Sequence, residues 1–110
     1  MKKVYRIHKN EEFKKIIFKK VRFKNNSFII YLSERKENYA RFGISVSKKL
    51  GNAVVRNKVK RQVKSMVHEV CDYYNHEYDC VIIVKTQFLE NEYNNNKISL
   101  EKLLKTSKMK

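Results

Sequence analysis

Six basic side chains within residues 48–61 have a spacing that indicates a binding site for phosphate groups. Lys48 and Lys49 stand just before the longest expected helix, and Arg56 and Lys58 occupy its first turns. The first N–H groups of a helix are unpaired and its dipole is positive there, so each cation at this end costs roughly a few tenths of a kcal/mol. A bound phosphate would reverse the sign, because the dipole, the free N–H groups and the cations would all face it.

The alternative is a merely solvated basic helix face, and the charge of the whole chain argues against it. The 110 residues include 26 Lys and Arg against 11 Asp and Glu, a formal net charge of +15. Residues 1–24 hold ten basic residues and two Glu, and residues 41–68 hold eight basic residues and no acid. A block of this length without a carboxylate repels itself unless a partner neutralises it. The sequence therefore predicts a polyanionic partner.

Length and composition exclude several classes of protein. A chain of 110 residues has room for a single domain, here 1–110, and its 42% hydrophobic share suffices for a modest core. No apolar run exceeds five residues, so we expect no membrane association. Cys71 and Cys80 do not make a disulfide framework, and a reduced, cytoplasmic setting fits them better.

Protein-based catalysis and metal binding find little support in the sequence. The three histidines have no metal-ligand spacing with the cysteines. No Ser–His–Asp arrangement, Gly-rich phosphate loop or carboxylate pair in a basic surround can be picked out. Glu69 and Asp72 could help to hold a hydrated magnesium ion, although a plain surface pair is the simpler interpretation. We therefore expect no catalytic residue and no metal ligand in the protein.

Seven elements in the order α-β-β-β-α-β-α are expected to position the basic residues. Asn10 with the two Glu that follow is typical of a helix N-cap, and residues 39–47 alternate between apolar and polar side chains. A strand, helix and strand in succession from residue 39 form a βαβ unit, which makes the two strands parallel. The fold class is α+β, a single sandwich with a four-stranded mixed sheet. The expected helices are 10–20, 53–74 and 97–107, the strands are 21–24, 27–33, 39–47 and 79–86, and the main loops are 48–52 and 87–96.

The expected helix over 53–74 carries two stripes, and Asn52 is its expected N-cap. At 100° per residue, one side is apolar and an adjoining side is basic. The apolar side must face the core. Its members are Val55, Val59, Val63, Met66, Val70 and Tyr74, and those of the basic side are Asn57, Lys60, Arg61, Lys64 and His68.

Three motifs at fixed spacing carry a family resemblance: SVSKK at 45–49, GNAV at 51–54 and RNxxKR at 56–61. KNEEF at 9–13 and FIIY at 28–31 agree with them, as does the order of elements. Together they closely resemble the bacterial ribonuclease P protein component over most of the chain, from about residue 3 to 104.

The resemblance implies a ribonucleoprotein enzyme in which RNA is the catalyst. In that family a large RNA cleaves precursor tRNA to release its 5′ leader, using magnesium ions that the RNA mainly holds. The protein is the non-catalytic subunit, and its partners are the catalytic RNA and the leader of precursor tRNA. The resemblance also implies that the βαβ crossover has the rare left hand, against the general right-handed rule.

The resemblance further implies two sets of site residues. Phe13, Ile17, Tyr31 and Ser45 are expected to line the cleft that receives the leader, with Ile17 standing where relatives often have an aromatic residue. Lys64 stands where Arg is usual, which keeps the charge but loses the flat bidentate fork. The residues expected to bind the catalytic RNA are Lys48, Lys49, Asn52, Arg56, Asn57, Lys58, Lys60, Arg61 and Lys64.

Residue chemistry supports such a cleft independently, with alternatives. Phe13 projects from a helix and Tyr31 from a strand, and single-stranded RNA is commonly held by aromatic stacking inside a basic groove. Phe13 could equally be an ordinary core residue. Arg41, Ser45 and Ser47 could form a polar sheet face that touches RNA or one that is only solvated. A structural RNA-binding protein of the ribosomal type is the main alternative function, and a stand-alone nuclease is a third.

Overall fold

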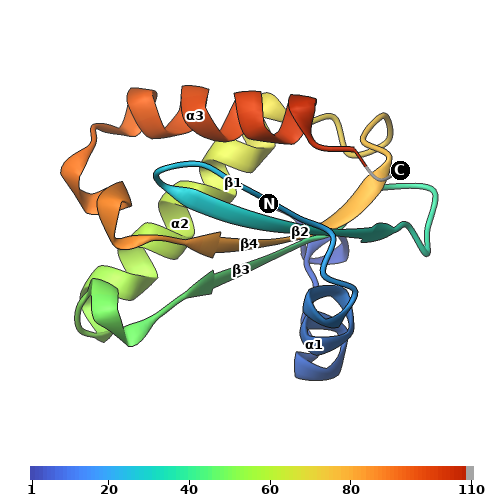
Figure 1. Cartoon of the computed structure of the whole chain (residues 1–110), viewed down its shortest axis with the longest axis horizontal. Helices are drawn as coiled ribbons and strands as arrows, with labels where there is room; N and C mark the ends of the chain where they lie inside the picture. Colours follow the sequence, from blue (N-terminus) through green and yellow to red (C-terminus); the bar gives the residue numbers. More distant parts are fainter. Residues whose placement is uncertain (109–110) are drawn as a thin grey trace.

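The computed structural model describes residues 1–108 and shows a four-stranded mixed sheet with helices on both faces (Figure 1). The predicted α+β class and the order α-β-β-β-α-β-α are confirmed. The structure also contains three short 3-10 helices that the sequence did not predict, at Lys3–Tyr5, Lys48–Leu50 and Thr86–Glu90. The elements are α1 (Asn10–Phe18), β1 (Arg22–Lys24), β2 (Phe28–Glu34), β3 (Phe42–Val46), α2 (Ala53–Val70), β4 (Tyr78–Val84) and α3 (Tyr93–Thr106).

The sheet has the strand order β1-β2-β4-β3. β4 lies between β2, with which it pairs antiparallel, and β3, with which it pairs parallel. The predicted parallel βαβ unit is therefore confirmed, with α2 as its crossover. The left hand of that crossover stays a prediction of the resemblance.

One face of the sheet packs against α2 and α3, which lie on the same side of it in Figure 1. Alternate strand positions such as Phe28, Ile30 and Phe42 point into this core, as the period of two requires. From α2, Val59, Val63 and Met66 are buried against them, which confirms most of the predicted apolar stripe. Leu100, Leu103 and Leu104 of α3 close the core, as expected.

The opposite face of the sheet is covered in part by α1 and by the segment that precedes it (Figure 1). Ile16 of α1 and Val81 of β4 are buried together there, with Ile7 from the segment before the helix. Phe13, Ile17 and Tyr31 surround this smaller cluster and stay half-buried. Because these three residues remain half-buried, this side of the sheet keeps an open margin.

Two predicted helix ends are wrong. Helix α1 begins at Asn10 with Lys9 at the N-cap position, and it stops at Phe18. Helix α2 stops at Val70, four residues before Tyr74. The carboxylate of Asp72 accepts hydrogen bonds from the Tyr74 N–H at 3.0 Å and the Asn75 amide at 2.6 Å, which stabilises a turn in place of a further helical turn.

The expected loop over 87–96 is also wrong in its second half, because α3 already begins at Tyr93. Asn96 lies within this helix and is buried, although Asn-rich sequence is typical of loops. Its side chain accepts a hydrogen bond from Ser27 Oγ at 3.1 Å and donates one to the Phe88 carbonyl at 2.9 Å. These distant partners satisfy the buried amide and allow the helix to start early.

Candidate nucleic-acid interface

The start of α2 is held by local contacts that do not involve its cations. The Asn52 side chain accepts a hydrogen bond from the Val55 N–H at 3.1 Å, which confirms Asn52 as the N-cap. Gly51 precedes it with φ of 144°, a value that favours glycine. A Cβ at Gly51 would lie 3.0 Å from Val55 Cβ, so a side chain would also crowd the first turn.

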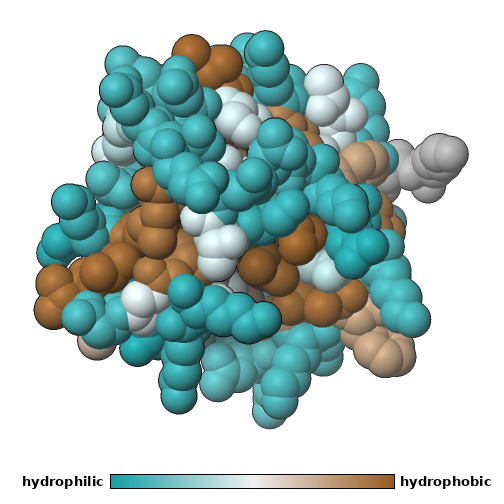
Figure 2. Space-filling model, turned by 60° about the vertical axis from the view of Figure 1, so that its left-hand side comes forward, coloured by the Kyte–Doolittle hydropathy of each residue, from teal (hydrophilic) through white to brown (hydrophobic). Residues whose placement is uncertain are grey.

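We call the residues that are expected to bind RNA, other than Asn52, the basic surface; they are Lys48, Lys49, Arg56, Asn57, Lys58, Lys60, Arg61 and Lys64. None of its seven cations forms an ion pair within residues 1–108, whereas Lys36, Arg41, Lys97 and Lys105 all do. Lys48, Lys49, Asn57, Lys58 and Arg61 are exposed, and Arg56, Lys60 and Lys64 are half-buried. Figure 2 shows the side of the molecule on which α2 begins, where hydrophilic side chains surround a hydrophobic band.

The electrostatics of Lys64 show how crowded this surface is with positive charge. Burial, and then the nearby charges of Arg6 and Lys60, lower the pKa of its ammonium group. Arg6 was missed in the sequence. Its segment runs beside β3, where Arg6 bridges Phe42 and the Ile7 N–H donates to the Phe42 carbonyl at 2.9 Å. The sequence signal for the position of Arg6 is its alternation with buried Ile7, and two residues are too few to predict a segment that runs beside a strand.

The residues expected to bind the leader do gather on one side of the sheet, beside α1. Phe13, Ile17 and Tyr31 belong to the same cluster, and Ser45 pairs with Ile83 on that sheet face. The ring of Phe13 lies directly over Gly43, because a Cβ there would lie 2.5 Å from Phe13 Cζ. Phe13 is thus both partly core and partly accessible.

At the far end of α1 this face opens into a pocket of about 320 Å³. Ile17 and Tyr31 line it together with Lys20 and Arg22, two cations that the sequence prediction did not include. Lys20 has φ of 60°, which costs a non-glycine residue about 1–2 kcal/mol and ends the helix. Arg22 lies opposite Tyr31 in the β1–β2 pairing, so the strand register, had it been known, would have placed Arg22 beside the predicted leader-binding residue.

Two carboxylates hold the side chain of Arg41, so the alternative of a merely solvated residue is wrong for Arg41. Contact of this sheet face with RNA stays a prediction. The Nη2 of Arg41 donates to Glu12 of α1 at 2.7 Å and to Asp79 of β4 at 3.0 Å, and the Arg41 side chain is 14% exposed. The hydrogen bond from Arg41 lowers the pKa of Glu12. The Arg41 backbone N–H donates to the other Asp79 oxygen at 2.9 Å. This Glu12–Arg41–Asp79 network ties α1 to the sheet.

Of the groups considered from the sequence for protein-based chemistry, the two acids near the end of α2 have partners and the two cysteines are half-buried or buried. Glu69 forms an ion pair with Lys97 at 3.3 Å, and Asp72 is engaged in the turn after α2. Burial raises the pKa of Cys71 to about 12, and buried Cys80 is also a free thiol. Within residues 1–108, no three His, Cys, Asp or Glu side chains are grouped as metal ligands, and no helix is long and apolar enough to cross a membrane.

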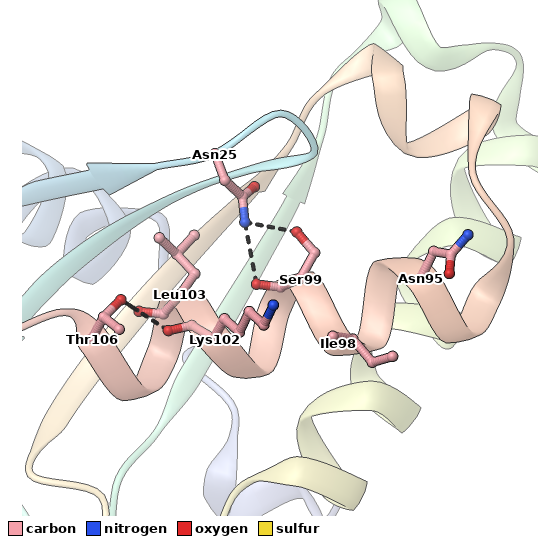
Figure 3. Close-up of a pocket in the computed structure, with 7 residues that line it drawn as sticks. All are labelled: Asn25, Asn95, Ile98, Ser99, Lys102, Leu103 and Thr106. Atoms are coloured by element: carbon pink, nitrogen blue, oxygen red, sulfur yellow. Dashed lines mark hydrogen bonds between the residues drawn. The ribbon is translucent and has the colours of Figure 1, made fainter.

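A larger cavity of about 470 Å³ lies between α3 and the turn joining β1 to β2 (Figure 3). Asn25 donates from its amide to the Ser99 carbonyl at 3.2 Å and to Ser99 Oγ at 2.7 Å, so this polar group already has partners. Lys102 is its single charged lining residue among those described. The contacts around this cavity fasten α3 to the sheet and suggest no further chemistry.

Comparisons with known proteins agree with the geometry. A family model described as Ribonuclease P matches residues 1–108. The ribonuclease P protein component of Mesoplasma florum is 43% identical over 99 residues, which span 89% of this chain and 90% of that protein. The RNase P protein of Staphylococcus aureus has a TM-score of 0.79 at 37% identity, covering 94% of this chain and 95% of that one. The Thermotoga maritima RNase P protein has a TM-score of 0.80 at 27% identity, covering 94% and 98%. This chain therefore belongs to the family of bacterial ribonuclease P protein components.

Proposed function

We propose that this protein is the RNA-binding subunit of a ribonuclease P that removes the 5′ leader from precursor tRNA in the cytoplasm. The basic surface and Asn52 bind the catalytic RNA, and the face bearing Phe13, Ile17, Tyr31 and Ser45 binds the leader. The RNA carries the chemistry, and the protein raises the affinity for substrate.

The observation that carries this proposal is the basic surface, whose seven cations, before and along α2, form no ion pair within residues 1–108. Most cations of the described chain form no ion pair, and this group is distinguished because its seven members all lie within residues 41–68, which contain no acid. The dipole and the unpaired N–H groups of α2 add to the attraction for phosphate at the same place. Burial lowers the pKa of Lys64, and the charges of Arg6 and Lys60 lower it further; phosphate groups of a large RNA would relieve this repulsion between the cations.

The leader face has the properties that a sequence-tolerant site for single-stranded RNA requires. Its half-buried Phe13 and Tyr31 offer aromatic surface, and every base can stack on such surface at about 1–3 kcal/mol per base. Lys20 and Arg22 line the pocket next to Tyr31 and would hold a phosphate there. A subunit that accepts many leaders needs affinity without base readout.

Magnesium fits the RNA better than this protein. Mg²⁺ is usually bound by one or two carboxylates together with substrate phosphates and water. The two acids near the end of α2, Glu69 and Asp72, already have partners, and the basic surface would repel the ion. The protein's contribution is then to neutralise phosphates, so that fewer metal ions are needed to hold the RNA folded.

The test is to incubate precursor tRNA with a bacterial ribonuclease P RNA at low magnesium, with and without the full chain. We expect cleavage to rise strongly with the protein present. No gain would refute the proposal, and cleavage by the protein alone would indicate a stand-alone nuclease. Co-sedimentation with ribosomal subunits without tRNA processing would favour a ribosomal role.

Two charge-matched double variants separate specific binding from net charge. K60A/R61A removes two cations from the basic surface, and K102A/K105A removes two from α3. We expect the first to weaken binding of the catalytic RNA by about tenfold or more and the second to change it little. Equal losses in the two variants would mean that only the total charge matters.

A further inference from the structure

A groove of about 460 Å³ lies beside the first turns of α2, between that helix and the segment leading into α3. Val59 and Phe88 form its buried floor, and Val54, Leu89 and half-buried Tyr93 line its sides. Val54 is 77% exposed and Leu89 is 50% exposed. The hydrophobic band in Figure 2 lies on this side of the molecule.

The surroundings of the groove identify the kind of partner. Lys58 lines the groove itself, and the other cations of the basic surface lie on the same helix or just before it. A second copy of this chain is a poor occupant, because two molecules of charge +15 repel each other. The occupant must combine negative charge with a flat apolar group, and an unstacked nucleotide does so.

We propose that this groove receives an unstacked nucleobase of the ribonuclease P RNA, held by apolar contact with Val54 and Leu89 while Lys58 binds its phosphate. The inference rests on the proposed function and extends it from phosphate binding to base binding. The volume is large enough for a base, and unpaired bases of structured RNA are commonly splayed into such sites.

The polar groups around the groove set the direction from which the nucleotide enters. Gln62 lines it and can bond a base edge, whereas the side chains of Asn91 and Asn96 already bond to Ser27, Gln87 or Phe88. Glu90 and Glu92 follow Leu89 in the sequence and would repel phosphate on their side. The RNA backbone therefore runs along α2, where Lys58 and the other cations lie.

The experiment compares V54S/L89S with I98S, which changes an exposed apolar residue of α3 outside the groove. Both sets of positions are exposed, so the folds should survive, and thermal unfolding will check this. We expect V54S/L89S to lower the affinity for the ribonuclease P RNA by about 5- to 30-fold. Because no charge is removed, its salt dependence should equal that of the wild type. I98S should bind normally.

Chemical probing of the RNA supplies the direct readout. Wild-type protein should protect the pairing edge or ribose of a particular unpaired nucleotide, and V54S/L89S should restore its reactivity while other contacts persist. Unchanged affinity and probing with V54S/L89S would overturn the inference, and so would a wild-type dimer that the variant dissociates. The proposed function would still stand if wild-type protein stimulates cleavage, so the two failures are distinguishable.

Discussion

Replacing Arg41 by Met is expected to destabilise the fold strongly, because Arg41 is the cation that pairs with a buried carboxylate. The side chains of Arg41 and Asp79 are 14% and 2% exposed, and they are joined at 3.0 Å. Removing one partner of a buried pair costs about 3–5 kcal/mol, since the other charge is left uncompensated. For a domain of this size the melting temperature should fall by about 12–20 °C.

A double-mutant cycle separates the pair from the packing of the two side chains. R41M, D79N and R41M/D79N are compared with the wild type by urea unfolding at pH 7. In the double variant the buried carboxylate is gone, so its loss of stability should be smaller than the sum of the two single losses by about 1.5–3 kcal/mol. Losses that add to within about 0.5 kcal/mol would refute the reasoning.

The same network also predicts a functional effect through α1. Arg41 joins Asp79 of the sheet to Glu12, and Phe13 follows Glu12 on the helix that covers the leader face. At a temperature where R41M stays folded, we expect weaker binding of substrates with a long leader but unchanged binding of leaderless substrates. Equal losses for both substrates would mean that α1 keeps its position without Arg41.

Four further changes test other parts of the site. Gly43→Ala should cost about 1–3 kcal/mol and weaken leader binding, because its Cβ would lie 2.5 Å from Phe13 Cζ; denaturation and leader titrations measure the two effects. Phe13→Leu keeps most of the apolar burial but removes the aromatic ring, so it should lower leader affinity by about fivefold or more with little loss of stability. Equal affinity of this variant for long-leader and leaderless substrates would mean that Phe13 is only a core residue. Arg61→Ala should reduce the slope of log affinity for RNA against log salt by about 0.7–0.9, and an unchanged slope would remove Arg61 from the contact surface. Glu12→Gln should lower stability at pH 7 but not in acid: Arg41 lowers the pKa of Glu12 in the fold below its ordinary 4.5, so this stabilisation is present above pH 4.5 and is lost as pH falls through the folded pKa. Urea unfolding of wild type and E12Q, at pH 7 and at a pH below the folded pKa of Glu12, checks this difference.

Features that depend on neighbouring residues were predictable from the sequence. The alternation of side chains in β3 follows from the period of a strand, and the apolar stripe of α2 follows from the period of a helix. Asn52 caps α2 through a bond to Val55, three residues away. The parallel βαβ unit then follows from the order of these elements.

Features that depend on distant partners were not predictable. Tyr73 lies outside α2, although the sequence predicted it to be helical, because its ring stacks on Tyr5 with centroids 3.9 Å apart and is buried there. Helix α3 begins early because Asn96 bonds to Ser27, which lies 69 residues before it. Sequence patterns alone predict helix for residues 71–74 and loop for residues 93–96, because they contain no information about which surface each segment will meet.

Arg41 and Arg56 show why site residues are harder to predict than elements. Both are half-buried, and both have an Nε that lacks a hydrogen-bond partner within the described chain. Arg41 nevertheless meets two carboxylates, 29 and 38 residues away, whereas Arg56 forms no ion pair within residues 1–108. Their residue type gives no hint of this difference. Only the pairing of charges in space separates a cation that holds the fold together from one that remains for a ligand.

The start of α2 shows how the chain tolerates cations at the positive end of a helix. The helix does not depend on its first-turn charges, because Asn52 satisfies the Val55 N–H and Val59 and Val63 bury its apolar side. A stable start of this kind allows Arg56 to remain without an acidic neighbour, even though an acid would stabilise the isolated helix. An acid placed there would pair with the cations and compete with RNA phosphates for them. The absence of acids from residues 41–68 is therefore a cost in helix stability that leaves the basic surface without carboxylate partners, as the proposed binding of RNA requires.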